Sequence, residues 1–183
     1  MEWMLELDGN ILLFIQEHLR FEWMTPIWKF ITSLGDSGWF WILLTIILLL
    51  SKKTRKIGIA SALSLAIGVL ITNITLKNLV ARTRPYEVVE GLSLLVERAN
   101  DYSFPSGHSC ASFASAFVIY KMTPRKFGVP ALILAALIAL SRLYVGIHYP
   151  TDVIAGTIIG IISALIALCI IKKYSENKKR EIK

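Results

Sequence analysis

The sequence contains little cysteine, with Cys110 and Cys169 the only two among its 183 residues. They lie near opposite ends of different expected helices, about 20 Å apart in depth at a rise of about 1.5 Å per residue. A disulfide requires Cα atoms within about 7 Å of each other. This excludes a disulfide between them, and we interpret both cysteines as buried packing residues.

Two further features are missing: a signal peptide and a nucleic-acid-binding module. The opening stretch MEWMLELDGN lacks a basic start and an apolar core, so we expect no cleavage. The net charge is +7, but the basic residues gather in short clusters between apolar runs. No module combines basic and aromatic residues, which excludes nucleic acid as the expected partner. This charge distribution is typical of a polytopic membrane protein.

Long apolar runs are what the chain does have. Hydrophobic residues make up 55% of it and its mean hydropathy is +0.59, whereas soluble domains have roughly 45–50% apolar residues. A bilayer crossing takes about 20 residues. Four stretches are long enough or nearly so, at 57–79, 105–121, 127–146 and 150–171. A fifth, GWFWILLTIILLL from Gly38, is shorter and begins with tryptophans that suit a membrane interface.

Residues 3–34 alternate apolar and charged side chains and predict amphipathic helices, at the interface or packed on the bundle. We therefore predict an all-α transmembrane bundle of five spans preceded by these helices, with six spans as the alternative. The expected organisation is one membrane-embedded domain followed by a basic cytoplasmic tail. Its divisions are 1–37 for the N-terminal helices, 38–171 for the transmembrane core and 172–183 for the tail.

The basic clusters predict the orientation in the membrane. Threading five spans brings SKKTRK (51–56), KMTPRK (121–126) and KKYSENKKR (172–180) to one side. The positive-inside rule makes that side cytoplasmic. The opposite side then carries the loop over 81–104 and the tight turn near His148.

Charged and polar residues from three separate segments converge on that opposite side. Such groups at membrane depth are costly and usually functional. The converging residues are Lys77, Arg84, Ser106, His108, Arg142, His148 and Asp152. Two histidines, three cations and a carboxylate at a single membrane face predict a site for an anion.

The first two segments have the chemistry of an anion site. Lys77 and Arg84 bracket a helix end, and the planar fork of arginine suits bidentate binding of phosphate oxygens. In FPSGHS, Pro105 is placed to begin a helix, and Gly107 lets backbone N–H groups approach a ligand. The start of a helix itself binds anions.

In the third segment, HYPTD, His148 and Asp152 are four residues apart. If the stretch is helical throughout, they share a face, and the carboxylate holds one imidazole tautomer. The alternative is a helix that begins at Pro150, in which case helix geometry does not pair them. Asp152 is then also interpretable as a charge favoured at a helix start.

Other charged residues have ordinary interpretations. A lone Lys or Arg at a helix end is more often an interfacial anchor than a ligand. We place four residues in this class: Arg20, Lys29, Arg82 and Arg98. His18 is interpreted as part of an amphipathic helix face.

Three blocks in order carry a family resemblance. They are K-x6-R-P from Lys77, P-S-G-H from Pro105 and S-R-x5-H-x3-D from Ser141. Together they resemble the signature of the type-2 phosphatidic-acid phosphatase superfamily, which includes bacterial lipid phosphatases and soluble vanadium haloperoxidases. The resemblance implies His148 as the nucleophile that forms a phosphohistidine, oriented by Asp152, with His108 as general acid and then base. It implies that the phosphoryl oxygens are held by Lys77, Arg84, Ser106, Gly107 and Arg142.

The resemblance implies an integral membrane lipid phosphatase with its site on the extracytoplasmic face of a bacterial plasma membrane. Since three cations replace a metal clamp, we expect no metal and no cofactor. Undecaprenyl pyrophosphate is the favoured substrate, followed by phosphatidylglycerophosphate and phosphatidic acid. The expected partners are the lipid phosphate and bilayer lipids, with no obligatory protein partner.

Some alternatives stay open at this point. Residues 85–104 form either a partial lid over the site or a plain connecting loop. The same charges also suit a non-hydrolytic lipid-binding or transport protein. A phosphotransferase that passes the phosphoryl group to a second lipid is the other alternative.

Overall fold

The computed structural model describes residues 2–181, which form helices, turns and loops and contain no strand. The predicted all-α class is confirmed. In chain order the elements are α1 (Glu2–Leu19), α2 (Thr25–Ser33), η1 (Asp36–Gly38), α3 (Trp39–Leu50), α4 (Arg55–Val69), η2 (Leu70–Leu76), α5 (Lys77–Val80), α6 (Pro85–Val88), α7 (Gly107–Met122), α8 (Arg125–Tyr144) and α9 (Pro150–Glu181). The last two residues of the expected tail, 182–183, lie outside the described residues.

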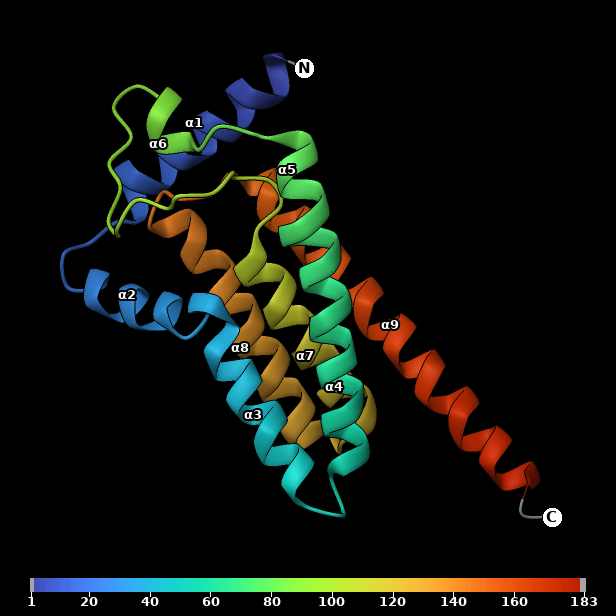
Figure 1. Cartoon of the computed structure of the whole chain (residues 1–183). Coiled ribbons are helices and arrows are strands. Elements are labelled where there is room, and N and C mark those ends of the chain that lie inside the picture. Colours follow the sequence, from blue (N-terminus) through green and yellow to red (C-terminus); the bar gives the residue numbers. More distant parts are fainter. Residues whose placement is uncertain (1, 182–183) are drawn as a thin grey trace.

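Helix α7 lies at the centre of the bundle and packs against α4, α8 and α9 (Figure 1). Small side chains such as Ser112 and Ala116 are fully buried on it and let its neighbours approach closely. Helix α9 approaches through glycines, since a Cβ at Gly156 would lie 2.3 Å from the Ser106 carbonyl oxygen. Gly160 meets the Cys110 carbonyl oxygen in the same way, at 2.5 Å. These contacts hold the beginning of α7 against the beginning of α9.

The helices account for three or four membrane spans by length and composition. Arg55–Val88, Arg125–Tyr144 and Pro150–Asn177 each qualify, and the pair Thr25–Ser33 and Asp36–Leu50, bent by 45°, makes a fourth if it is one span. A helix lies over each of the five expected stretches, but the central α7 has only 16 residues. The count of five and the division of the chain at 37 and 171 therefore stay predictions.

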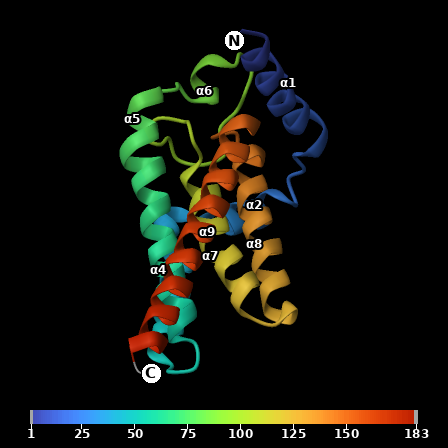
Figure 2. The same ribbon diagram turned by 90° about the vertical axis from the view of Figure 1, so that its right-hand side faces the viewer.

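The two ends of the bundle differ in what they carry. The turn between α3 and α4, the turn between α7 and α8 and the end of α9 lie at one end, and these segments hold the three basic clusters (Figure 1). The loop after α5 and the turn between α8 and α9 lie at the other end. Figure 2, turned by 90°, shows the same separation, with α9 running obliquely from one end to the other.

The N-terminal helices are separate from the long helices of the bundle. Helix α1 lies at the end opposite the basic clusters, beside α6 (Figure 1). It buries Asp8 and Leu12 while Leu5 and Phe14 stay exposed, as expected for an amphipathic helix. Leu12 packs with Leu92, in the loop that follows α6, and with Tyr149, in the turn before α9. Helix α1 therefore covers part of the bundle end that lies opposite the basic clusters.

Both cysteines are free, in agreement with the expectation of no disulfide. Cys110 is buried on α7, but Cys169 is exposed on the outer face of α9. The expectation that both are buried was wrong for Cys169, because α9 has long stretches of apolar side chains without protein neighbours.

Candidate active site

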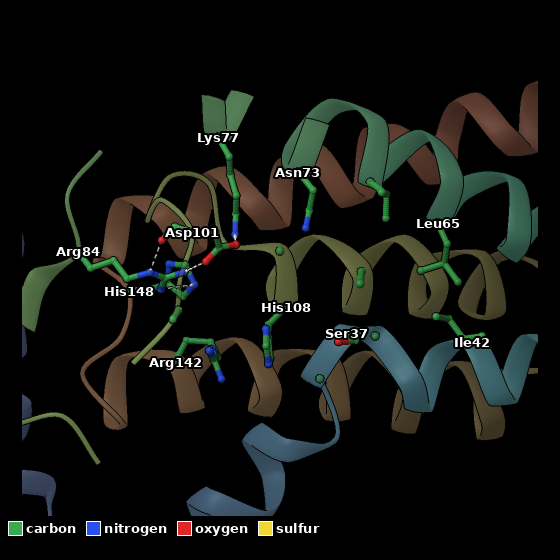
Figure 3. A pocket seen from close by; sticks show the side chains of 16 residues that line it. Ser37, Ile42, Leu65, Asn73, Lys77, Arg84, Asp101, His108, Arg142 and His148 are labelled. Carbon is green, nitrogen blue, oxygen red and sulfur yellow. Dashed lines mark hydrogen bonds and ion pairs between the residues drawn. The ribbon is translucent and has the colours of Figure 1, made fainter. Parts of the chain in front are cut away.

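A cavity of about 280 Å³ opens at the end of the bundle away from the basic clusters. Figure 3 shows that side chains from α5, α7, α8 and three connecting segments point into it. Its wall includes most of the predicted site residues: Lys77, Arg84, Gly107, His108, Arg142 and His148. Segments more than sixty residues apart in the sequence therefore meet at one cavity, as the threading predicted.

His148 and Asp152 form a pair, although not through a continuous helix. Helix α9 begins at Pro150, so His148 lies in the turn before it. The His148 Nδ1 and Asp152 Oδ2 atoms are 3.4 Å apart. The same oxygen accepts hydrogen bonds from the Tyr149 N–H at 3.0 Å and from the Ser103 hydroxyl at 2.5 Å. The alternative of a helix that begins at Pro150 is therefore the correct one. The turn before α9, and not the periodicity of a helix, brings His148 and Asp152 together.

His148 is almost fully buried, with 2% of its surface exposed. Burial lowers the pKa of its imidazole to about 3, and the nearby charges of Arg142 and Arg84 act in the same direction. The Asp152 carboxylate opposes this shift without overcoming it. His148 is therefore neutral at physiological pH, and with Nδ1 directed at Asp152 its Nε2 is the ring nitrogen that lies on the side of Arg84.

His108 also has a carboxylate partner, which the sequence did not reveal. Its Nε2 lies 2.9 Å from Oδ1 of Asp36, at the start of η1. Gly35 allows this approach, since a Cβ there would lie 2.4 Å from the His108 ring. The kink between α2 and α3 thus supplies a second carboxylate for the site.

Lys77 and Arg84 both form ion pairs with one carboxylate, that of Asp101. Lys77 pairs with Asp101 Oδ2, and Arg84 Nη2 lies 2.5 Å from Oδ1 of the same carboxylate. Burial alone would raise the pKa of Asp101, but the hydrogen bonds and charges of Lys77 and Arg84 outweigh it and lower that pKa. Asp101 was missed by sequence analysis because a carboxylate in a polar loop is ordinary. Its position shows that the two cations converge on a single anion-binding position.

Arg142 and Ser106 complete the predicted set. Arg142 donates from Nη1 to the Thr32 hydroxyl at 2.5 Å, and its buried Nε has no hydrogen-bond partner among residues 2–181. Arg142 thus lines the cavity with a guanidinium whose Nε is buried and unsatisfied within the described part of the chain. Ser106 caps α7, with its hydroxyl accepting hydrogen bonds from the Ser109 N–H and hydroxyl, and it is fully buried without lining the cavity. Phosphate binding by Ser106 stays a prediction.

The opposite end of the cavity is apolar. Ile42 of α3 and Leu65 of α4 line it, and His108 and Asn73 lie between this end and the cations (Figure 3). Asn73 was not predicted, although it precedes Lys77 by one helical turn within an apolar run, which was the available signal. The cavity therefore changes from charged to apolar along its length.

The loop over 85–104 belongs to the site. Asp101 and Ala99 line the cavity, and the Leu95 N–H donates to the Val145 carbonyl in the turn before α9 at 3.1 Å. The segment thus forms one side of the cavity and is held to the α8–α9 turn, and its action as a lid stays a prediction.

The residues interpreted as interfacial anchors have different surroundings. Arg98 is exposed and lies over the Tyr86 ring. Arg20 is partly buried and donates to Gln16 and Ser93. The interpretation was wrong for Arg82, which forms an ion pair with the buried Asp152 at 2.6 Å. The sequence did not reveal this ion pair because Arg82 and Asp152 are 70 positions apart and meet only in the folded chain.

Comparison with known proteins identifies the family of this chain. The family model described as the PAP2 superfamily matches residues 57–176. An undecaprenyl-diphosphatase from Sulfolobus acidocaldarius is 38% identical over 120 residues, which are 66% of this chain and 58% of that protein. The chain thus spans less than two thirds of that relative's length.

Two solved structures are similar over most of both chains. LpxE from Aquifex aeolicus has a TM-score of 0.77 and 28% identity, covering 87% of this chain and 93% of that one. A PAP2-type phosphatidylglycerolphosphate phosphatase from Bacillus subtilis has a TM-score of 0.73 and 26% identity, covering 94% and 86%.

Proposed function

Because this chain belongs to the PAP2 superfamily, we propose that it is a membrane lipid phosphatase that hydrolyses a lipid diphosphate through a phosphohistidine intermediate. The observation that carries the proposal is the cavity itself. It places the buried, neutral His148 among Lys77, Arg84 and Arg142 at one end and leaves an apolar wall at the other. A lipid phosphate has this same division between a charged head and an apolar chain.

In the proposed first step, His148 Nε2 attacks the terminal phosphorus. An N–P bond forms while the bond from phosphorus to the leaving oxygen breaks, and His108 donates a proton to that oxygen. Asp152 stabilises the imidazole as it becomes positively charged. In the second step His108 removes a proton from water, the water oxygen bonds to phosphorus, and the N–P bond breaks to release phosphate.

The three cations stabilise the transferring group. Phosphoryl transfer spreads negative charge over three equatorial oxygens, and fixed positive groups stabilise it without reorganising. Arg84 Nη1 lies 3.5 Å from His148 Nε2, so its guanidinium is next to the attacking atom. The Arg142 guanidinium and the Lys77 ammonium also line the cavity and supply further donors.

The leaving group lies, in this proposal, between His108 and Asn73, with the lipid chain along Ile42 and Leu65 (Figure 3). In a lipid diphosphate the leaving group is the second phosphate, which suits a position lined by an imidazole and an amide. This arrangement, and the relative named an undecaprenyl-diphosphatase, favour undecaprenyl pyrophosphate over the other two lipids. Phosphatidylglycerophosphate, named for the similar Bacillus subtilis structure, comes next.

We place the site at the extracytoplasmic face of the plasma membrane. The support is that α5 and the turn between α8 and α9, which line the charged part of the cavity, lie at the end of the bundle opposite the three basic clusters (Figure 1). Clusters of Lys and Arg close to span ends mark the cytoplasmic side.

Phosphate release from three lipids tests the proposal. The full chain in detergent is given undecaprenyl pyrophosphate, phosphatidylglycerophosphate or phosphatidic acid, and released phosphate is measured. We expect the diphosphate to be hydrolysed fastest, with an acid-labile phosphoenzyme trapped by rapid quenching. His148→Ala should abolish both, whereas His18→Ala, an exposed histidine on α1, should not.

Three outcomes contradict the proposal in different ways. Equal rates on all three lipids would indicate a phosphatase without preference for diphosphates. Tight lipid binding without phosphate release would indicate a binding or transport protein. Transfer of the phosphoryl group to a second lipid in place of water would indicate a transferase.

A further inference from the structure

Arg82 lies between two buried carboxylates, one from the catalytic pair and one from the N-terminal helix. Its Nη1 is 2.6 Å from Asp152 Oδ1, and its Nη2 is 2.8 Å from Asp8 Oδ2. The Asp152 and Asp8 side chains are 0% and 3% exposed, and that of Arg82 is 16% exposed. A guanidinium offers two nitrogens in a rigid plane, which suits bridging of this kind.

The two oxygens of Asp152 have different partners. Oδ2 faces His148 Nδ1 and accepts from Ser103 and the Tyr149 N–H. Oδ1 accepts from Arg82. Arg82 therefore holds the carboxylate in the rotation that directs Oδ2 toward His148, and it compensates a charge that burial would otherwise penalise.

Arg82 is itself held on several sides. Its Nη1 also donates to the Thr151 hydroxyl at 2.7 Å, and its guanidinium lies 3.8 Å from the centroid of the Tyr149 ring. Asp8 accepts from the Thr151 N–H at 3.2 Å and from the Thr151 hydroxyl. Asp8 thus binds both Arg82 and the first turn of α9, to which Asp152 belongs.

From this geometry we propose that Arg82 and Asp8 are positioning residues for the His148–Asp152 pair, so that α1 contributes to turnover. The inference rests on the proposed phosphatase function. Neither Arg82 nor Asp8 lines the cavity, so neither contacts the substrate. Arg82 and Asp8 therefore affect how Asp152 orients the His148 ring and stabilises its positively charged form. They do not affect how the lipid phosphate is bound.

The test compares kcat and KM for phosphate release by the full chain in detergent, using undecaprenyl pyrophosphate. Arg82→Gln should lower kcat about ten- to a hundredfold, by analogy with the loss of a residue that hydrogen-bonds and orients a metal-ligating side chain. KM should stay within about twofold, since a group that acts only on the chemical step changes kcat and kcat/KM equally. Asp8→Asn should lower kcat in the same way but less, because Arg82 keeps its bond to Asp152.

A double variant separates positioning from general damage to the fold. If Asp8 acts through Arg82, Asp8→Asn combined with Arg82→Gln should lower kcat no further than Arg82→Gln alone. Arg82→Lys keeps the charge and should recover part of the lost kcat without reaching both carboxylates. The matched controls are Glu6→Gln on α1 and Arg98→Gln in the loop, both exposed, and neither should change kcat.

The outcomes distinguish this inference from the proposed function. If the unaltered chain releases phosphate while Arg82→Gln and Asp8→Asn keep its kcat, the positioning inference is wrong and the function stands. A rise in KM with unchanged kcat, or additive losses in the double variant, would also overturn it. If the unaltered chain releases no phosphate from any of the three lipids, the proposed function itself fails.

Discussion

Asp36 Oδ1 lies 2.9 Å from His108 Nε2, although 72 positions separate the two residues in the chain. The other histidine of the cavity has a carboxylate as well, with Asp152 Oδ2 lying 3.4 Å from His148 Nδ1. Each histidine thus has one ring nitrogen directed at an acid. The two acids differ in setting, since Asp152 is fully buried and the Asp36 side chain is 62% exposed.

The Asp36–His108 contact predicts a dependence on the leaving group. His108→Ala should slow phosphoenzyme formation from phosphatidylglycerophosphate, whose leaving alkoxide needs a proton, about 10²–10⁴-fold, the usual contribution of a general acid or base. Phosphoenzyme formation from p-nitrophenyl phosphate should be slowed much less, because nitrophenolate leaves without a proton. Asp36→Asn should show the same pattern more weakly, since it disturbs only the orientation of His108. Rapid-quench measurement of phosphoenzyme formation from both substrates checks this, because it excludes the second step, and equal losses on both would contradict an acid role for His108.

Asp101 predicts a change in anion affinity. A phosphate that binds Lys77 and Arg84 has to displace the Asp101 carboxylate, whose side chain is 50% exposed. Ion pairs with a solvent-accessible partner contribute about 0.2–1 kcal/mol, so Asp101→Asn should tighten inhibition by vanadate about 1.4- to fivefold. Glu97→Gln, an exposed acid in the same loop, serves as the control. Unchanged or weaker inhibition would indicate that Asp101 does not compete for this position.

The burial of His148 predicts its behaviour with pH. Burial lowers the pKa of its imidazole to about 3, which means that the proton is lost more easily and the neutral form persists well below pH 6.5. In ¹⁵N-histidine-labelled protein, the His148 resonances, assigned by their loss in His148→Asn, should stay those of a neutral ring from pH 8 to about pH 5. Protonation centred near pH 6.5 would show that His148 is solvated like an ordinary surface histidine.

The cation cluster predicts activity without a divalent metal. Lys77, Arg84 and Arg142 place three cationic side chains around the cavity, and in the proposed mechanism they hold the phosphoryl oxygens in place of a metal clamp. Phosphate release should therefore keep at least about half of its rate in EDTA, since no step of the proposed mechanism uses a metal. Loss of turnover on chelation, restored by added magnesium, would show that these cations are not sufficient.

Much of the cavity wall was predictable because charged residues are rare next to long apolar runs. A bilayer strongly penalises charged groups, so a residue such as Lys77 or Arg142 near the end of an apolar run has few ordinary interpretations. Helix ends also alternate between the two membrane faces, which places residues of distant segments on one side before any contact is known. For this reason Lys77, His108 and Arg142 were assigned to one face by counting spans.

The partners of these residues were decided only by the tertiary structure. Asp8, Asp36, Arg82 and Asp101 lie in an amphipathic helix, a kink and two loops, where polar side chains are common and carry no local signal. Asp8 and Arg82 are 74 positions apart and meet because α1 packs over the turn that precedes α9. The sequence by itself determined which cations and histidines line the cavity, because the membrane restricts where such groups lie. Which acids and bases hold those groups depends on paths of loops and short helices that no local pattern specifies.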